Sequence, residues 1–141
     1  MPNGSWLSTP AGSRRRAIVL LNRVADREPG AFARLSAALT PAVAAQLRSS
    51  PLSRADVEAI TAATLLEVWW LARFHRTSDT DIWSWIADIA DRRARERLEL
   101  LSADAAVPAG DRPDADGTGR DPVAADDDHN RRLYRGLVRH G

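Results

Sequence analysis

The chain has 141 residues, no cysteine and a net charge of +1 at pH 7. This length forms one modest domain with tails, and the lack of cysteine excludes disulfide frameworks and cysteine-ligated zinc sites. No apolar run approaches the roughly 18 residues that a membrane span needs, so we expect a cytoplasmic protein with no membrane partner. All 20 basic residues are arginine, and they are distributed unevenly along the chain.

The first third of the sequence predicts a disordered start followed by two helices. Residues 1–12 carry Pro, Gly and Ser without periodicity and are expected to be disordered. From Ser13, apolar residues at helical spacing predict a first helix that ends before the Pro-Gly pair at 29–30. A second helix begins near Ala31, and Pro41 inside it should kink or split it.

The middle of the chain predicts two further helices. Ser53, followed three residues later by Asp56, has the pattern of a capping box and predicts the start of the third helix. Its apolar stripe is wide, so this helix should be central. A polar loop follows at about 75–80, and the fourth helix runs to about Leu101. The first half of the fourth helix is apolar and its second half is basic, with Arg92, Arg93, Arg95 and Arg97.

The C-terminal part of the sequence is divided by charge. Residues 102–130 contain eight aspartates and two arginines, a net of −6, and are predicted to be a disordered acidic linker. Residues 131–141 contain four arginines and no acid, and Gly136 makes a helix there marginal. The linker is either a solvated tail or a cover for the arginine cluster. The fold prediction is an all-α, compact bundle of about four helices over residues 13–101, with disordered tails.

Nothing in the sequence favours catalysis or metal binding. The three histidines, His75, His129 and His140, are scattered over the loop and tail. There is no Ser-His-Asp order, no paired buried carboxylates and no HExxH motif. We therefore expect no enzyme activity, no metal site and no cofactor.

Three segments carry a pattern known from one protein family. Residues 20–43 read LLNRVADREPGAFARLSAALTPAV, residues 56–69 read DVEAITAATLLEVW and residues 85–98 read WIADIADRRARERL. They are similar to the patterns LL.R...GD..AF..LY...AP.V, DAEDVVQEVFLEVW and WLLTIAHRRAVDRL. The chain thereby resembles region 2 of the extracytoplasmic-function group of bacterial sigma factors, in the sigma-70 family. The positions that together carry the match are Phe32, Pro41, Trp69, Phe74, Trp85 and the arginine cluster.

This resemblance implies a transcription function without enzyme activity. In the family, the polar face of the third helix docks on the clamp helices of core RNA polymerase. The following loop captures an unstacked base, and the basic fourth helix contacts promoter DNA near the −10 element. The implied polymerase or partner interface is Glu58, Ala59, Ala62, Ala63 and Glu67, to which we add Trp70 because tryptophan is enriched at interfaces. The implied DNA-binding residues are His75, Arg76, Arg92, Arg93, Arg95 and Arg97.

The chain departs from the family pattern in three places. Ala59, Ala62 and Ala63 stand where the family has Asp, Gln and Glu, so polymerase binding should be weaker. The loop reads FHRTSDTD, whereas the family reads FDPxxGS. The residues after Leu101 lack the pattern of region 4, so region 4 would come from another chain.

Two functions therefore stay open. The retained arginines favour a sigma-like protein acting at RNA polymerase and promoter DNA. The three alanines favour a degenerate sigma-like module for protein–protein interaction, for example with an anti-sigma regulator. The arginines also have a structural interpretation, because Asp88, Asp91 and Glu96 lie within three or four residues of them.

The tryptophans divide into two predicted groups. Trp69 and Trp85 align with core tryptophans of the family, so we expect both in the core. Trp70 and Trp83 lie beside them in the sequence and should point elsewhere, toward a base or a protein partner.

Overall fold

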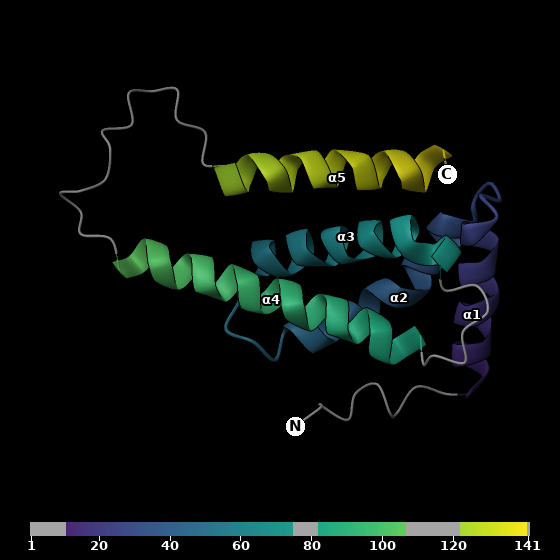
Figure 1. The fold of residues 1–141 in the computed structure, drawn as a ribbon, viewed down its shortest axis with the longest axis horizontal. Coiled ribbons are helices and arrows are strands. Elements are labelled where there is room, and N and C mark those ends of the chain that lie inside the picture. The colour runs from purple at the N-terminus through teal and green to yellow at the C-terminus, as the bar shows by residue number, and fades with distance from the viewer. Residues whose placement is uncertain (1–10, 75–81, 107–121, 141) are drawn as a thin grey trace.

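The computed structural model describes residues 11–74, 82–106 and 122–140, and these residues are almost entirely helical (Figure 1). The all-α prediction is confirmed. None of the helices in these ranges combines the length and apolarity that crossing a bilayer requires. Of residues 1–12, predicted to be disordered, Ala11 and Gly12 instead begin α1, and residues 1–10 lie outside the described residues. Residues 107–121 of the predicted linker and the predicted loop at 75–80 also lie outside the described residues. The elements are α1 (Ala11–Ala25), α2 (Ala31–Leu47), α3 (Arg54–Leu71), the 3-10 turn η1 (Ala72–Phe74), α4 (Ile82–Ala106) and α5 (Pro122–His140).

Helix α2 is continuous through its proline. Gly30 caps its N-terminus with φ of 80°, a left-handed conformation that glycine adopts without strain. Pro41 is exposed and lies within the helix, where it supplies no backbone N–H. The neighbouring Thr40 hydroxyl donates a hydrogen bond of 2.6 Å to the Ser36 carbonyl. Of the predicted kink or split at Pro41, the split is wrong, because the helix runs unbroken through the proline, which is exposed to solvent.

Helix α3 begins as its capping pattern predicts. The Ser53 hydroxyl accepts a hydrogen bond of 3.1 Å from the Asp56 backbone N–H and donates one of 2.7 Å to the Asp56 carboxylate. The helix is buried over most of its circumference and packs against α2, α4 and α5. The expectation that this helix is central is confirmed, because three other helices pack around it.

The core lies where α1, α2 and η1 meet the middle of α3 and the first half of α4 (Figure 1). Apolar residues at three- and four-residue steps turn one side of each helix inward. The second half of α4 runs past this core toward solvent, which leaves Arg92 and Arg95 exposed and Arg93 and Arg97 partly buried. The largest fully buried apolar side chains are Leu21, Phe32, Leu35, Leu39, Leu47, Leu65 and Ile86.

The C-terminal part differs most from its prediction. Helix α4 continues to Ala106 because residues 102–106 are mostly alanine, the strongest helix former. Residues 122–130, predicted to belong to a disordered linker, are the first half of α5, and the predicted short basic tail is its second half. Pro122 occupies the first helical position, where proline is favoured. Asp127 and Asp128 precede Arg131 and Arg132 by four residues, a spacing and order that support a helix.

The tryptophans are also arranged differently from the prediction. Trp83, predicted to point away from the core, is buried with 5 % of its surface exposed. Trp69 and Trp85, predicted core residues, are only partly buried and pack against the edge of the core. Trp83 lies in register with the buried Ala87, Ala90 and Ala94, so the inward face of α4 passes through it. Trp70 is 60 % exposed, as expected.

Candidate functional site

Helix α5 lies along α3 and runs in the same direction (Figure 1). Near its start, Asp127 is joined through Arg97 to Asp56 at the beginning of α3. At its end, His140 lines the same hollow as Trp69, near the end of α3. Helix α5 therefore covers a surface of α3 and also contacts α2.

The predicted partner interface on α3 is buried beneath this helix. Ala59, Ala62 and Ala63 are 2 %, 6 % and 7 % exposed. Ala59 and Ala63 line one hollow with α5 residues, and Ala62 lines a second hollow with Arg131 and Tyr134. Alanines at steps of three and four residues give α3 a shallow stripe on which another helix can lie closely. These alanines, which depart from the family pattern, thus form the seat of α5.

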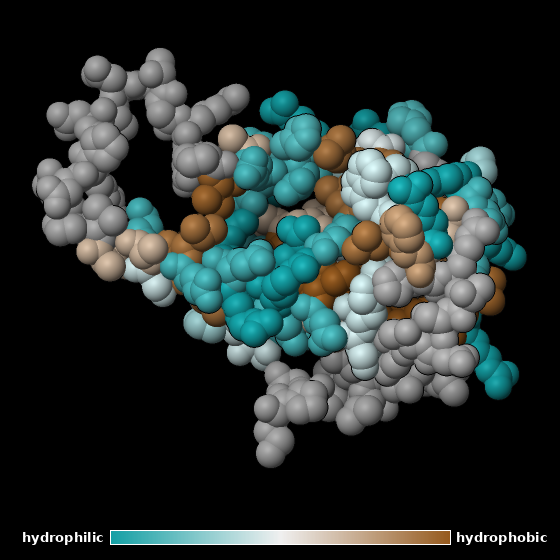
Figure 2. All heavy atoms as spheres, in the orientation of Figure 1, coloured by the Kyte–Doolittle hydropathy of each residue, from teal (hydrophilic) through white to brown (hydrophobic). Residues whose placement is uncertain are grey.

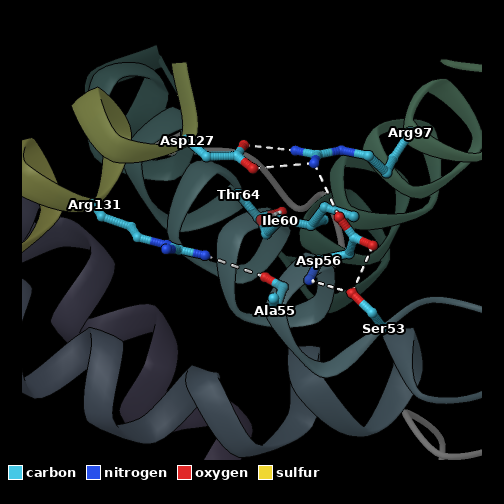
Figure 3. Close-up of polar contacts among 8 residues, drawn as sticks. All are labelled: Ser53, Ala55, Asp56, Ile60, Thr64, Arg97, Asp127 and Arg131. Atoms are coloured by element: carbon cyan, nitrogen blue, oxygen red, sulfur yellow. Dashed lines mark hydrogen bonds and ion pairs between the residues drawn. The ribbon is translucent and has the colours of Figure 1, made fainter. Parts of the chain in front are cut away.

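An arginine joins three helices at the start of this seat (Figure 3). Arg97 donates to both carboxylate oxygens of Asp127, at 2.6 and 3.0 Å, and to the Asp56 carboxylate at 3.0 Å. All three side chains are less than one-fifth exposed. The hydrogen bond from Arg97 to Asp127 is the main cause that raises the pKa of Arg97, and burial opposes it. In the structure, Arg97, one of the four α4 arginines predicted to contact DNA, binds α5.

A second carboxylate holds the other two arginines of the α4 cluster. Glu67 on α3 accepts hydrogen bonds from Arg92 at 2.5 Å and from Arg93 at 2.7 and 3.0 Å. The Glu67 side chain is 19 % exposed, while those of Arg92 and Arg93 are 49 % and 31 % exposed. Glu67, predicted to contact polymerase, is therefore an internal link between α3 and α4. Of the local pairings expected along α4, Arg92 lies 3.9 Å from Glu96.

The acid stability of the fold should depend on Glu67. Burial raises the pKa of its carboxyl, but hydrogen bonds from Arg92 and Arg93 and their positive charges together hold that pKa below its ordinary value. A depressed pKa adds stability above the unfolded value, about 4.3 for glutamate, and this stability is lost as the pH falls through the folded value. We expect the difference in unfolding free energy between wild type and Glu67→Gln to stay constant from about pH 7 to 5 and to shrink toward pH 3. Urea unfolding across this range measures it, and an unchanged difference at the acid end would contradict the assignment.

A cluster of aromatic side chains lies at the C-terminal end of α3. The Arg27 guanidinium lies 3.7 Å from the centroid of the Trp69 ring, and its Nη1 donates to the Trp69 carbonyl at 3.3 Å. Trp70 packs edge-on against Trp69, with ring centroids 5.4 Å apart, and exposes most of its surface. Phe74 follows at 67 % exposure. The predicted interface residue Trp70 is thus accessible. It lies at the C-terminal end of α3, whereas Arg97 of α4 contacts the N-terminal end of α3.

The remaining predicted site residues do not join a single site. Glu58 is exposed and pairs with Arg54 at 3.2 Å on the same helix. Arg95 is exposed on α4. His75 and Arg76 lie outside the described residues. The structure brings Arg92, Arg93 and Glu67 into one cluster and leaves Glu58 and Arg95 apart from it.

Two residues of the site were missed from the sequence. Asp127 and Tyr134 lie on α5, and the Tyr134 ring packs edge-on against Phe32 with centroids 5.9 Å apart. The available signal was the spacing of Tyr134, Leu137 and Val138, which all pack against the core. This amphipathic pattern was missed because the sequence was divided by net charge, which assigned the two halves of one helix to an acidic linker and a basic tail.

Hollows flank α5 on both sides. One, of about 210 Å³, lies between α3, α4 and α5. The other, of about 790 Å³, lies between α2, α3 and α5 and is bordered by Arg48, Arg54, Arg131 and Arg135. Figure 2 shows hydrophilic side chains gathered over α4 and apolar ones in the gap between α4 and α5. The contact of α5 with the rest of the molecule is therefore less completely filled than the core.

In comparisons with known proteins, no protein-family model, no curated protein and no solved structure matches this chain.

Proposed function

We propose that this chain is a sigma region 2-like transcription protein that acts through protein contacts made by α3. The observation that carries the proposal is the alanine stripe of α3, which holds a helix in the structure. In the family that residues 19–98 resemble, the corresponding face docks on the clamp helices of core RNA polymerase. A stripe that accommodates α5 has the shape to accommodate a helix of another protein. Core polymerase is the first expected partner, and an anti-sigma regulator or a chain bearing region 4 would use the same face.

The internal pairing of the arginine cluster weakens the case for DNA contact. Arg92 and Arg93 are bound by Glu67, and Arg97 is bound by Asp56 and Asp127. Each carboxylate offsets positive charge that would otherwise attract phosphate, and phosphate contacts dominate DNA affinity. A role at the −10 element would require these pairs to open.

Promoter DNA binding is kept as the second candidate because Arg92 is half-exposed and Arg95 is exposed. A forked −10-like DNA titrated at several salt concentrations tests this candidate. Binding with a salt dependence that flattens in Arg95→Ala would support DNA contact. Binding that is undetectable at low salt would exclude it.

Polymerase binding should increase when the family's polar residues are restored on α3. The variant Ala59→Asp, Ala62→Gln, Ala63→Glu places charged or longer side chains where α5 now lies, so α5 should be displaced. We expect this full-length variant to bind purified core polymerase at least about tenfold more tightly than wild type, a gain of about 1.4 kcal/mol. Binding is measured by co-elution and by titration of a labelled chain.

A matched control carries the same three residue types on an exposed surface of α2: Ala37→Asp, Ala38→Gln, Ala45→Glu. The control should bind polymerase as wild type does, and circular dichroism should show that both variants remain helical. If the α3 variant folds and forms no complex with polymerase at micromolar concentration, core polymerase is not the partner of this face.

A further inference from the structure

Helix α5 packs along α3 and also contacts α2, and the polar and aromatic contacts that hold it lie at separate points along the helix. At its start, Asp127 is bound by Arg97 (Figure 3). One turn later, Arg131 donates to the carbonyl of Ala55 at 3.4 Å. Toward its end, Tyr134 packs on Phe32. Apolar contact is concentrated in the second half, and the first half is attached mainly through charge.

Arg97 would remain paired if α5 left α3, because it binds a second carboxylate. Its Nη1 is shared between Asp127 and Asp56, both at 3.0 Å. Asp56 is itself fixed by the Ser53 cap of α3. When Asp127 leaves, Arg97 keeps a carboxylate partner, so the open state contains no unpaired arginine at this point. Departure of α5 therefore avoids the large cost of leaving a buried charge alone.

The surface beneath α5 is also suited to an open state. Its alanines expose little apolar area when uncovered, because their side chains are single methyl groups, and the larger apolar loss is confined to the second half of α5, where Tyr134 packs on Phe32. The hollows on both sides of α5 mean that fewer dispersion contacts are lost than in a fully packed core. Both features lower the free energy that separates the closed and open arrangements.

The connection to α4 is long enough for this movement. Fifteen residues, 107–121, join α4 to α5. Fully extended, they span up to about 50 Å, so α5 can leave α3 completely and remain attached. A helix tethered in this way acts as an intramolecular competitor at an effective concentration on the order of millimolar.

We propose that α5 is a removable intramolecular ligand of α3, and that its release opens the alanine stripe to a partner helix of the same chemistry. That partner is an amphipathic helix with a carboxylate at the position of Asp127. An aromatic or aliphatic surface follows it at the positions of Tyr134, Leu137 and Val138. This inference deepens the proposed function, on whose α3 face it rests, and it names the regulation of that face.

A peptide of residues 122–140 tests the proposal in full-length protein. Asp127→Ala removes charged hydrogen bonds that hold α5, so the open fraction should rise about tenfold or more. Because apparent affinity scales with the open fraction, this variant should bind the labelled peptide at least about tenfold more tightly than wild type. The matched control is Asp128→Ala, an exposed neighbour with the same change of charge, which should behave as wild type. Fluorescence anisotropy measures the binding.

The variant Arg97→Ala distinguishes release of α5 from unfolding of the whole protein. This variant also frees α5, but it deprives the added peptide of its arginine, so it should bind the peptide more weakly than Asp127→Ala does. Equal peptide binding by wild type, Asp127→Ala and Asp128→Ala would show that α5 is a fixed part of the fold and would overturn the proposal.

Light scattering and polymerase binding identify what occupies the stripe once α5 is released. If Asp127→Ala dimerises by exchanging α5 between copies, the occupant is a second copy, which would overturn the assignment of a separate partner. Enhanced peptide binding without dimerisation supports the proposal. If the peptide binds as expected and polymerase does not, the regulation stands and the proposed function fails.

Discussion

Trp83→Ala should destabilise the protein by about 3–5 kcal/mol, as expected for loss of a large buried aromatic side chain. Trp83 is 5 % exposed on the inward face of α4, while Trp70 is 60 % exposed at the end of α3. Trp70→Ala is therefore the matched control, and its unfolding free energy should stay within about 1 kcal/mol of wild type, because the variant loses only the edge-on contact with Trp69. Denaturant titration followed by circular dichroism measures both variants. A larger loss in Trp85→Ala than in Trp83→Ala would show that the face of α4 is wrongly assigned.

The second large effect is expected at Glu67. Glu67→Arg removes the acceptor of Arg92 and Arg93 and places a third positive charge between them. We expect a loss of about 2–3 kcal/mol in unfolding free energy, from the lost charged hydrogen bonds and the added repulsion. Glu58→Arg is the control with the same change of charge at an exposed site, and it should cost less than about 1 kcal/mol.

The effect of Glu67→Arg on stability also bears on function. Loss of partner binding in Glu67→Arg would follow from a disturbed α3–α4 contact, so it would not identify Glu67 as an interface residue. Similar stability of Glu67→Arg and Glu58→Arg would contradict the link between α3 and α4.

The first four helices could be predicted because each carries its own local signal. The Ser53–Asp56 pair fixes the start of α3, and the Pro-Gly pair at 29–30 separates α1 from α2. Local spacing also predicted the wide apolar surface of α3. What local spacing could not decide was which of two tryptophans, Trp83 and Trp85, faces inward. They lie two positions apart on a helix and so point in nearly opposite directions.

Helix α5 could not be predicted because its stability depends on a distant partner. Its apolar residues are few, and most of the stability of a protein helix comes from packing of its amphipathic face against other elements. The alanines on which α5 packs lie much earlier in the chain. Considered without α5, they indicate only that the polar residues of the family pattern are missing. The acidic segment and the basic segment predict a helix only when they are taken together, because acidic residues that precede basic ones stabilise a single helix.

The arginines of α4 were found from the sequence, but their partners were not. The expected partners lay three or four residues away on the same helix. The structure instead joins Arg93 to Glu67 on α3 and Arg97 to Asp127 on α5. Such contacts across helices follow from packing, which the spacing of charges along one helix does not report.

Hydrogen exchange of the full-length protein at neutral pH tests most directly that α5 covers the alanine stripe of α3. We expect measurable protection of the backbone amides around Tyr134 and Leu137, lower than that of the buried middle of α3, because α5 opens separately. Exchange at Ala62 and Ala63 should also be slower in wild type than in the Asp127→Ala variant. Exchange of α5 amides at the rate of the free peptide 122–140 would contradict the covering of α3 by α5.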